Sequence, residues 1–213
     1  MSGHQHDFMT TMKESSLILM FELLGSALLG SLFTCSYVSG DYTGLFCGFF
    51  ILLIFSARIS GSHFNPAVTL AFMMRKDTGR FNRVLGILYI VFQYAGAFLG
   101  VLLAWTILGA NKISLSRPPL TVLNTSDSGF LEFLQGSTME LLGVMLIVFL
   151  YLTQTEEKTK ISSDPAITTL IIAGTFFGVV GFAESSGVIT GSPFNPALSF
   201  ALFWNIIFTG DVK

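Results

Sequence analysis

Long apolar runs alternate with short polar connections along the chain. Runs close to the roughly 20 residues that a bilayer crossing needs occur at about 17–38, 43–60, 84–108, 133–153 and 166–183. This pattern predicts five membrane-spanning helices. Two shorter apolar stretches, 65–74 and 195–204, each begin with Asn-Pro. We expect re-entrant half-helices there, because asparagine suits the N-cap and proline the first helical position.

Composition supports a lipid environment. The chain is 52% hydrophobic and 11% charged, whereas soluble domains carry roughly 25% charged residues. A net charge of −2 offers no basic face to neutralise phosphates, which argues against nucleic acid as a partner. The bilayer itself is the first partner that we expect. The polar residues 1–16 lack the basic region of a secretory signal and the Arg-rich, acid-poor character of a transit peptide, and we expect them to form a cytoplasmic tail.

Charged residues give the expected orientation, because cytoplasmic loops collect lysine and arginine. One side of the predicted spans carries Lys13, Arg75, Lys76, Arg80, Arg83, Lys158, Lys160 and Lys213. Only Lys112 and Arg117 fall on the other side. The pattern predicts a multi-pass protein whose N-terminus is cytoplasmic, or on the equivalent face of another membrane.

An internal repeat organises the chain. Residues 61–67, Gly-Ser-His-Phe-Asn-Pro-Ala, match residues 191–197 at six of seven positions. Glu22-Leu-Leu-Gly recurs as Glu140-Leu-Leu-Gly. We therefore predict a tail at 1–16, a first repeat at 17–109, a connecting segment at 110–132 and a second repeat at 133–213. Three crossings in the first repeat would make the two repeats inverted, which is a transport architecture.

Two Asn-Pro-Ala motifs after apolar spans, with a glutamate in the first and fourth spans, resemble the aquaporin or major intrinsic protein family. The resemblance implies an all-α membrane protein with an aquaporin-like inverted repeat, here with five predicted transmembrane helices plus two re-entrant half-helices. Only 213 − 195 = 18 residues follow Asn195, so we expect the family's sixth helix to be absent. A shortened chain and a helix supplied by a neighbouring subunit both remain open.

The family's roles transfer to residues that match its motifs. The pore motifs are Asn65, Pro66, Ala67, Asn195, Pro196 and Ala197. Pore-lining positions are Gly61, Ser62, His63 and Gly191, with the backbone at 60–64 and 190–194 as acceptor of hydrogen bonds. The acids Glu22 and Glu140 are expected to support the loops. Six glycines at helical spacing, namely Gly25, Gly30, Gly96, Gly100, Gly174 and Gly178, are expected to allow close helix crossings.

The outer constriction departs from the family pattern. Water-selective members usually have an arginine after the second motif, where this chain has Leu198. By family spacing the other constriction positions are Leu45, Ala183 and Ser192, all small or apolar. This indicates an apolar outer mouth, with a reduced preference for water and either passage of small neutral solutes such as glycerol or blockage.

Two functions stay open from the sequence. One is a passive channel for water and small neutral solutes such as glycerol. The other is a non-conducting, aquaporin-derived structural subunit of a larger membrane complex. The resemblance implies a homo-oligomer, or a subunit of such a complex. No catalytic triad, metal-ligand spacing or phosphate loop is evident, so we predict no enzyme, no cofactor and no metal.

Overall fold

The computed structural model describes residues 15–75, 81–109, 130–185, 191 and 193–209. Its helices are α2 (Ser16–Ser39), α3 (Thr43–Ser56), α4 (Pro66–Met74), α5 (Arg83–Leu108), α7 (Phe130–Thr155), α8 (Pro165–Ser185) and α9 (Pro196–Thr209). The described part holds no strand, which confirms the all-α prediction. Ser192 and most of the predicted segments 1–16 and 110–132 lie outside the described residues.

Four helices, α2, α5, α7 and α8, are long and apolar enough to cross a membrane. α3 has only 14 residues, about 21 Å at 1.5 Å per residue. The predicted span 43–60 was therefore too long by four residues. Turns replace the helix after Ser56, and they lead the chain to Ser60, which donates to Glu22 of α2. α9 is longer than predicted, because it continues to Thr209.

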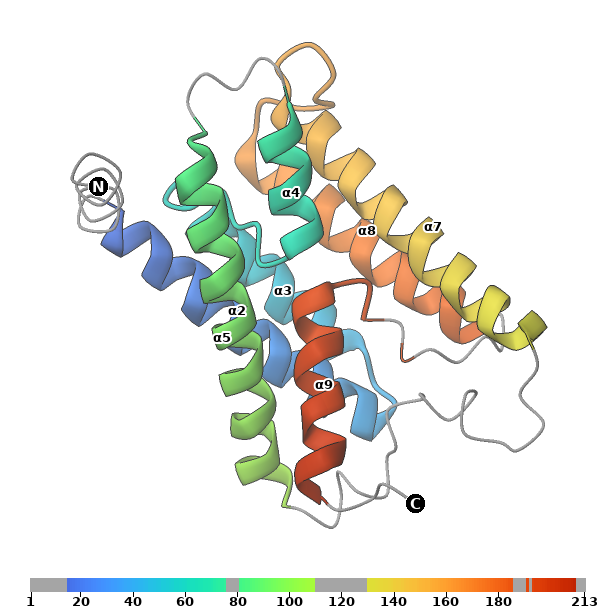
Figure 1. The fold of residues 1–213 in the computed structure, drawn as a ribbon. Coiled ribbons are helices and arrows are strands. Elements are labelled where there is room, and N and C mark those ends of the chain that lie inside the picture. The colour runs from blue at the N-terminus through green and yellow to red at the C-terminus, as the bar shows by residue number, and fades with distance from the viewer. Residues whose placement is uncertain (1–14, 76–80, 110–129, 186–190, 192, 210–213) are drawn as a thin grey trace.

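The two half-helices lie at the centre of the fold (Figure 1). α4 and α9 point their N-termini toward each other, with α2 and α5 on one side and α7 and α8 on the other (Figure 1). α2 packs on α5, α3 on α8, and α5 on α9. Both Asn-Pro-Ala motifs are thus brought to one junction between the repeats.

Glycines set the α2–α5 crossing. A Cβ on Gly96 would overlap the carbonyl of Leu23, and one on Gly100 would overlap the carbonyl of Ala27. The small-residue prediction is therefore right for these positions. It is wrong for Gly174 and Gly178, where an added Cβ would meet nothing within 4 Å among the described residues.

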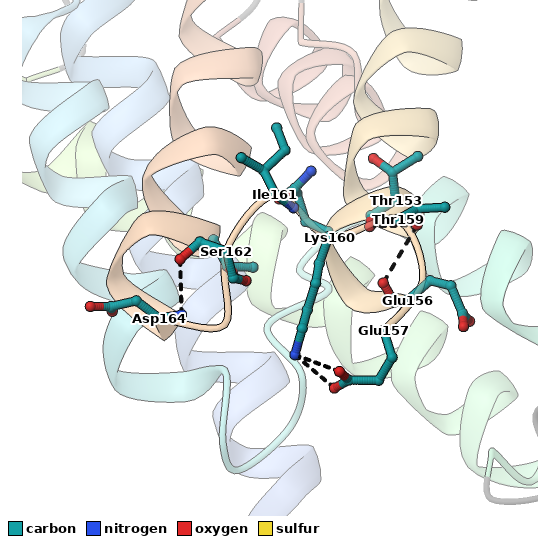
Figure 2. Close-up of polar contacts among 10 residues, drawn as sticks. Thr153, Glu156, Glu157, Thr159, Lys160, Ile161, Ser162 and Asp164 are labelled. Carbon is teal, nitrogen blue, oxygen red and sulfur yellow. Dashed lines mark hydrogen bonds and ion pairs between the residues drawn. The ribbon is translucent and has the colours of Figure 1, made fainter.

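Charged side chains gather where α4 ends, α5 begins and α7 turns into α8. Arg75 and Glu156 form an ion pair of 2.5 Å between the two repeats. In the α7–α8 connection Lys160 pairs with Glu157 at 2.7 Å, as Figure 2 shows. Asp164 accepts from a backbone amide in the first turn of α8 at 2.8 Å. This charged end of the bundle is the one that the basic residues predict to be cytoplasmic.

Candidate functional site

The N-terminus of each half-helix is capped by its own motif asparagine. Asn65 Oδ1 accepts from the amide of Ala67 at 2.9 Å, and Asn195 Oδ1 accepts from the amide of Ala197 at 3.0 Å. Pro66 follows as the first residue of its helix, where no amide donor is needed. Both asparagines are buried.

The same two asparagines also join the repeats. Asn65 Nδ2 donates to the carbonyl of Phe194 at 2.9 Å, and Asn195 Nδ2 donates to the carbonyl of Phe64 at 2.8 Å. Each asparagine thus bonds the residue that precedes the other asparagine. The junction is a reciprocal pair with matching geometry on both sides.

The two loops share a backbone conformation. Gly61 and Gly191 both have φ of +83°, while Phe64 and Phe194 have φ of +45° and +44°. A left-handed conformation costs a side-chain-bearing residue roughly 1–2 kcal/mol. The same positive φ values occur at equivalent positions of the two loops, so both repeats form the same loop conformation.

Burial of the phenylalanine rings offsets this backbone strain. Phe64 and Phe194 are 1% and 0% exposed. A Cβ on Gly25 would overlap the ring of Phe64, and one on Gly143 would overlap the ring of Phe194. The glycine that ends each Glu-Leu-Leu-Gly repeat therefore makes room for the ring of a loop.

Glu22 holds the first loop from α2. It is fully buried, and Oε1 accepts from Ser60 Oγ at 2.7 Å and from the amide of His63 at 3.0 Å. Oε2 accepts from the amide of Phe64 at 2.9 Å and from Gln93 Nε2 at 2.8 Å. Gln93 was not among the predicted site residues, because it lies inside the apolar run 84–108 and outside the duplicated motifs.

In the second repeat, Glu140 Oε2 accepts from the amide of Phe194 at 3.3 Å. The equivalent acids of the two repeats therefore both contact a loop amide. Glu140 is only half-buried, whereas Glu22 is fully buried. The two loops thus differ in how deeply their acids are enclosed.

His63 lies in an aromatic box. The rings around it belong to Phe72, Phe81, Tyr89 and Tyr151, with centroids 4.5, 5.4, 5.3 and 5.9 Å away. His63 is 5% exposed, and Nδ1 is 3.1 Å from Thr69 Oγ1. The side chain is enclosed by packed rings in this conformation.

Two tyrosines bind the carbonyl groups of the first loop. Tyr89 donates to the carbonyl of Ser60 at 2.6 Å. Tyr151 donates to the carbonyls of Gly61 and Ser62, the latter at 3.0 Å. The loop backbone was expected to offer free acceptors, but these three carbonyls already have donors. Sequence reasoning missed both tyrosines, because each lies inside an apolar span without a motif.

The three described residues of the predicted outer constriction are apolar and buried. Leu45 and Ala183 are fully buried, Leu198 is 1% exposed, and all three belong to one apolar cluster. Ser192, the fourth predicted position, lies outside the described residues. Gly191, predicted to line the pore, is buried.

Comparisons with known proteins identify the family of this chain. The family model described as Major intrinsic protein matches residues 15–206. Similar proteins include the Propanediol uptake facilitator PduF of Salmonella typhimurium, 28% identical over 72% of this chain and 60% of that protein. The Aquaporin PIP-type of Atriplex canescens is 29% identical over 71% of this chain and 50% of that protein. The Glycerol uptake facilitator protein of Escherichia coli strain K12 is 26% identical over 76% of this chain and 63% of that protein.

The matched parts therefore span less than two thirds of these relatives. The family model nevertheless covers most of the chain, including both Asn-Pro-Ala motifs. Four of the described helices have the length and composition of membrane spans. The chain belongs to the major intrinsic protein family and is an integral membrane protein with an aquaporin-like fold.

Proposed function

We propose that the chain forms a channel for the passive permeation of water and small neutral solutes such as glycerol. The observation that carries this proposal is the reciprocal asparagine pair at the junction of α4 and α9. An amide nitrogen has two protons, and the carbonyl across the junction takes one from each asparagine. The second proton of Asn65 and of Asn195 is then available to an oxygen of a permeating molecule.

The helix ends favour neutral permeants. Each half-helix places a positive partial charge, roughly half an elementary charge, at its N-terminus. α4 and α9 point these ends at the same junction (Figure 1). Cations, including hydronium, are repelled there, while a neutral hydroxyl finds donors.

Apolar side chains at the predicted outer constriction support solutes that carry a carbon skeleton. Leu45, Ala183 and Leu198 offer no donor and no charge. The names of several relatives refer to the uptake of propanediol and glycerol, which are small neutral solutes. These names lend no support to the alternative of a non-conducting structural subunit.

We further propose that the charged end of the bundle, where Arg75, Arg83, Lys158 and Lys160 lie, is cytoplasmic, as basic residues favour that face. A homo-oligomer is proposed from the family resemblance alone. The proposed channel needs no catalytic group, since permeation is passive.

Osmotic shrinkage of proteoliposomes tests the channel, with water and glycerol gradients run in parallel. Asn195→Asp keeps the cap acceptor but removes the donors, so we expect it to slow permeation. Asn82→Asp is the matched control, because Asn82 caps α5 in the same way, accepting from Val84 at 2.9 Å on an exposed surface. Its permeation rates should equal those of the wild type.

Rates equal to those of empty liposomes for the wild type would contradict the proposal. So would equal rates for Asn195→Asp and Asn82→Asp, because the junction donors would then have no part in permeation. Intact mass and circular dichroism of each sample show whether full-length, helical protein was reconstituted.

A further inference from the structure

Tyr151 connects the second repeat to the loop of the first. It lies on α7, near its C-terminal end, and is 3% exposed. Its hydroxyl donates to the carbonyls of Gly61 and Ser62. On the α4 side of the junction, α7 and this loop are therefore in direct contact across the interface between the repeats.

The loop turns one edge toward each repeat. Its amides at His63 and Phe64 face Glu22 on α2. Its carbonyls at Gly61 and Ser62 face Tyr151 on α7. The carbonyl edge, which is the edge able to accept from a permeating hydroxyl, is therefore directed into the interface between the repeats.

Aromatic rings pack against Tyr151 on this side. The ring of Tyr151 meets His63 edge-on at 5.9 Å and Phe72 at 5.8 Å. His63 and Tyr151 are both buried. The hydroxyl of Tyr151 thus occupies carbonyls that could otherwise accept from a permeating molecule, and its ring packs on His63 and Phe72.

Tyr89 makes a similar bond from the other direction. It lies on α5, within the first repeat, and donates to the carbonyl of Ser60. It therefore supports the loop without crossing the interface between the repeats. The position that corresponds to Tyr151 in the first repeat is Phe33, since 151 − 118 = 33 and Glu22 and Glu140 also differ by 118. Phe33 has no hydroxyl to donate.

We propose that Tyr151 closes the α4 side of the path by occupying the carbonyls of Gly61 and Ser62. Permeation then requires this side chain to move away from the two carbonyls. This inference rests on the proposed channel function. Tyr151 then determines how often the α4 side is open, while the junction donors determine how fast a solute crosses when it is open.

Proteoliposome permeation of three variants tests the inference. Tyr151→Ala removes ring and hydroxyl and should raise glycerol and water permeability about tenfold, if closure is favoured by about 1.4 kcal/mol. Tyr151→Phe keeps the ring and should give a smaller rise. Tyr89→Phe is the control, because it loses the same kind of bond within one repeat, and no increase is expected. If Tyr151→Ala fails to fold, Tyr151→Phe still tests the hydroxyl.

A labelling experiment separates this inference from the channel proposal. Gly143 faces Phe194 and Tyr151 faces Gly61, so Ile147 lies one turn from each on the same face of α7. In a Cys35→Ser, Cys47→Ser background, Ile147→Cys should react slowly with iodoacetamide while Tyr151 is present. Adding Tyr151→Ala should speed the reaction about tenfold, again about 1.4 kcal/mol.

Unchanged permeation and labelling in Tyr151→Ala would overturn the inference, while a rate lowered by Asn195→Asp would still support the channel. Background permeation in every variant would overturn the channel proposal and, with it, the role of Tyr151 in flux. Faster labelling in that case would show that Tyr151 covers the site without any solute crossing. Faster permeation in Tyr89→Phe equal to that in Tyr151→Phe would also contradict the inference.

Discussion

Replacing Glu22 by glutamine tests how the first loop is held. Each carboxylate oxygen accepts two hydrogen bonds, Oε1 from Ser60 and His63, and Oε2 from Phe64 and Gln93. Glutamine has one oxygen and one NH₂ group at these positions. Whichever way it is placed, the NH₂ group faces two donors.

Two of the four donors can adjust to the change. The Ser60 hydroxyl can rotate, and the Gln93 amide can turn over, because its Oε1 is buried without a partner among the described residues. The amides of His63 and Phe64 are fixed in the backbone, so one of them loses its acceptor. A buried unsatisfied donor costs about 1–3 kcal/mol, and this is the loss in unfolding free energy that we expect. Glu22→Ala removes the acceptor of both amides, and we expect about twice that loss.

Unfolding in mixed micelles by added dodecyl sulfate, followed by circular dichroism, measures the difference. Glu157→Gln is the control, since it makes the same atomic change at an exposed site that pairs with Lys160 (Figure 2). An exposed ion pair contributes about 0–1 kcal/mol. Equal unfolding free energies for Glu22→Gln and Glu157→Gln would refute the reasoning.

Two further predictions concern packing and selectivity. Gly96→Ala places a Cβ onto a carbonyl of α2 and should lower the unfolding free energy by about 1–3 kcal/mol; Gly178→Ala, in open space, should be neutral or stabilising in the same unfolding assay. Leu198→Arg should lower the ratio of glycerol to water permeability roughly tenfold, because it removes an apolar contact and adds donors. An unchanged ratio in proteoliposomes would contradict the assigned place of Leu198 at the outer constriction.

Apolar run lengths predicted most of the helices closely. The run at 17–38 corresponds to Ser16–Ser39, and the run at 84–108 to Arg83–Leu108. The run at 43–60 was predicted too long, because the apolar residues Ala57 and Ile59 follow the point where the helix ends at Ser56. The chain turns there for a tertiary reason, the bond from Ser60 to Glu22, and no local pattern records that bond.

The duplicated motifs identified the residues that make the same contacts in both repeats. They did not identify residues whose contacts occur in one repeat only. The asparagine caps follow from the local preference of Asn-Pro for a helix start, so the duplicated motif located Asn65 and Asn195. The contacts of Gln93 and Tyr151 depend on how distant helices pack. A tyrosine in an apolar span is typical of a buried or interfacial side chain, and only the fold shows that the Tyr151 hydroxyl reaches the loop.

Three of the bonds that join the repeats share one design. Asn65, Asn195 and Tyr151 each donate to a backbone carbonyl of the opposite repeat. Every residue has a backbone carbonyl, so the identity of the donor side chain determines where these contacts can form. The two asparagines are related by the repeat and form a balanced pair, whereas Tyr151 has no counterpart because Phe33 lacks a hydroxyl. The two halves of the proposed path are therefore not equivalent, and the α4 half can open through the movement of one side chain while the asparagine junction stays intact.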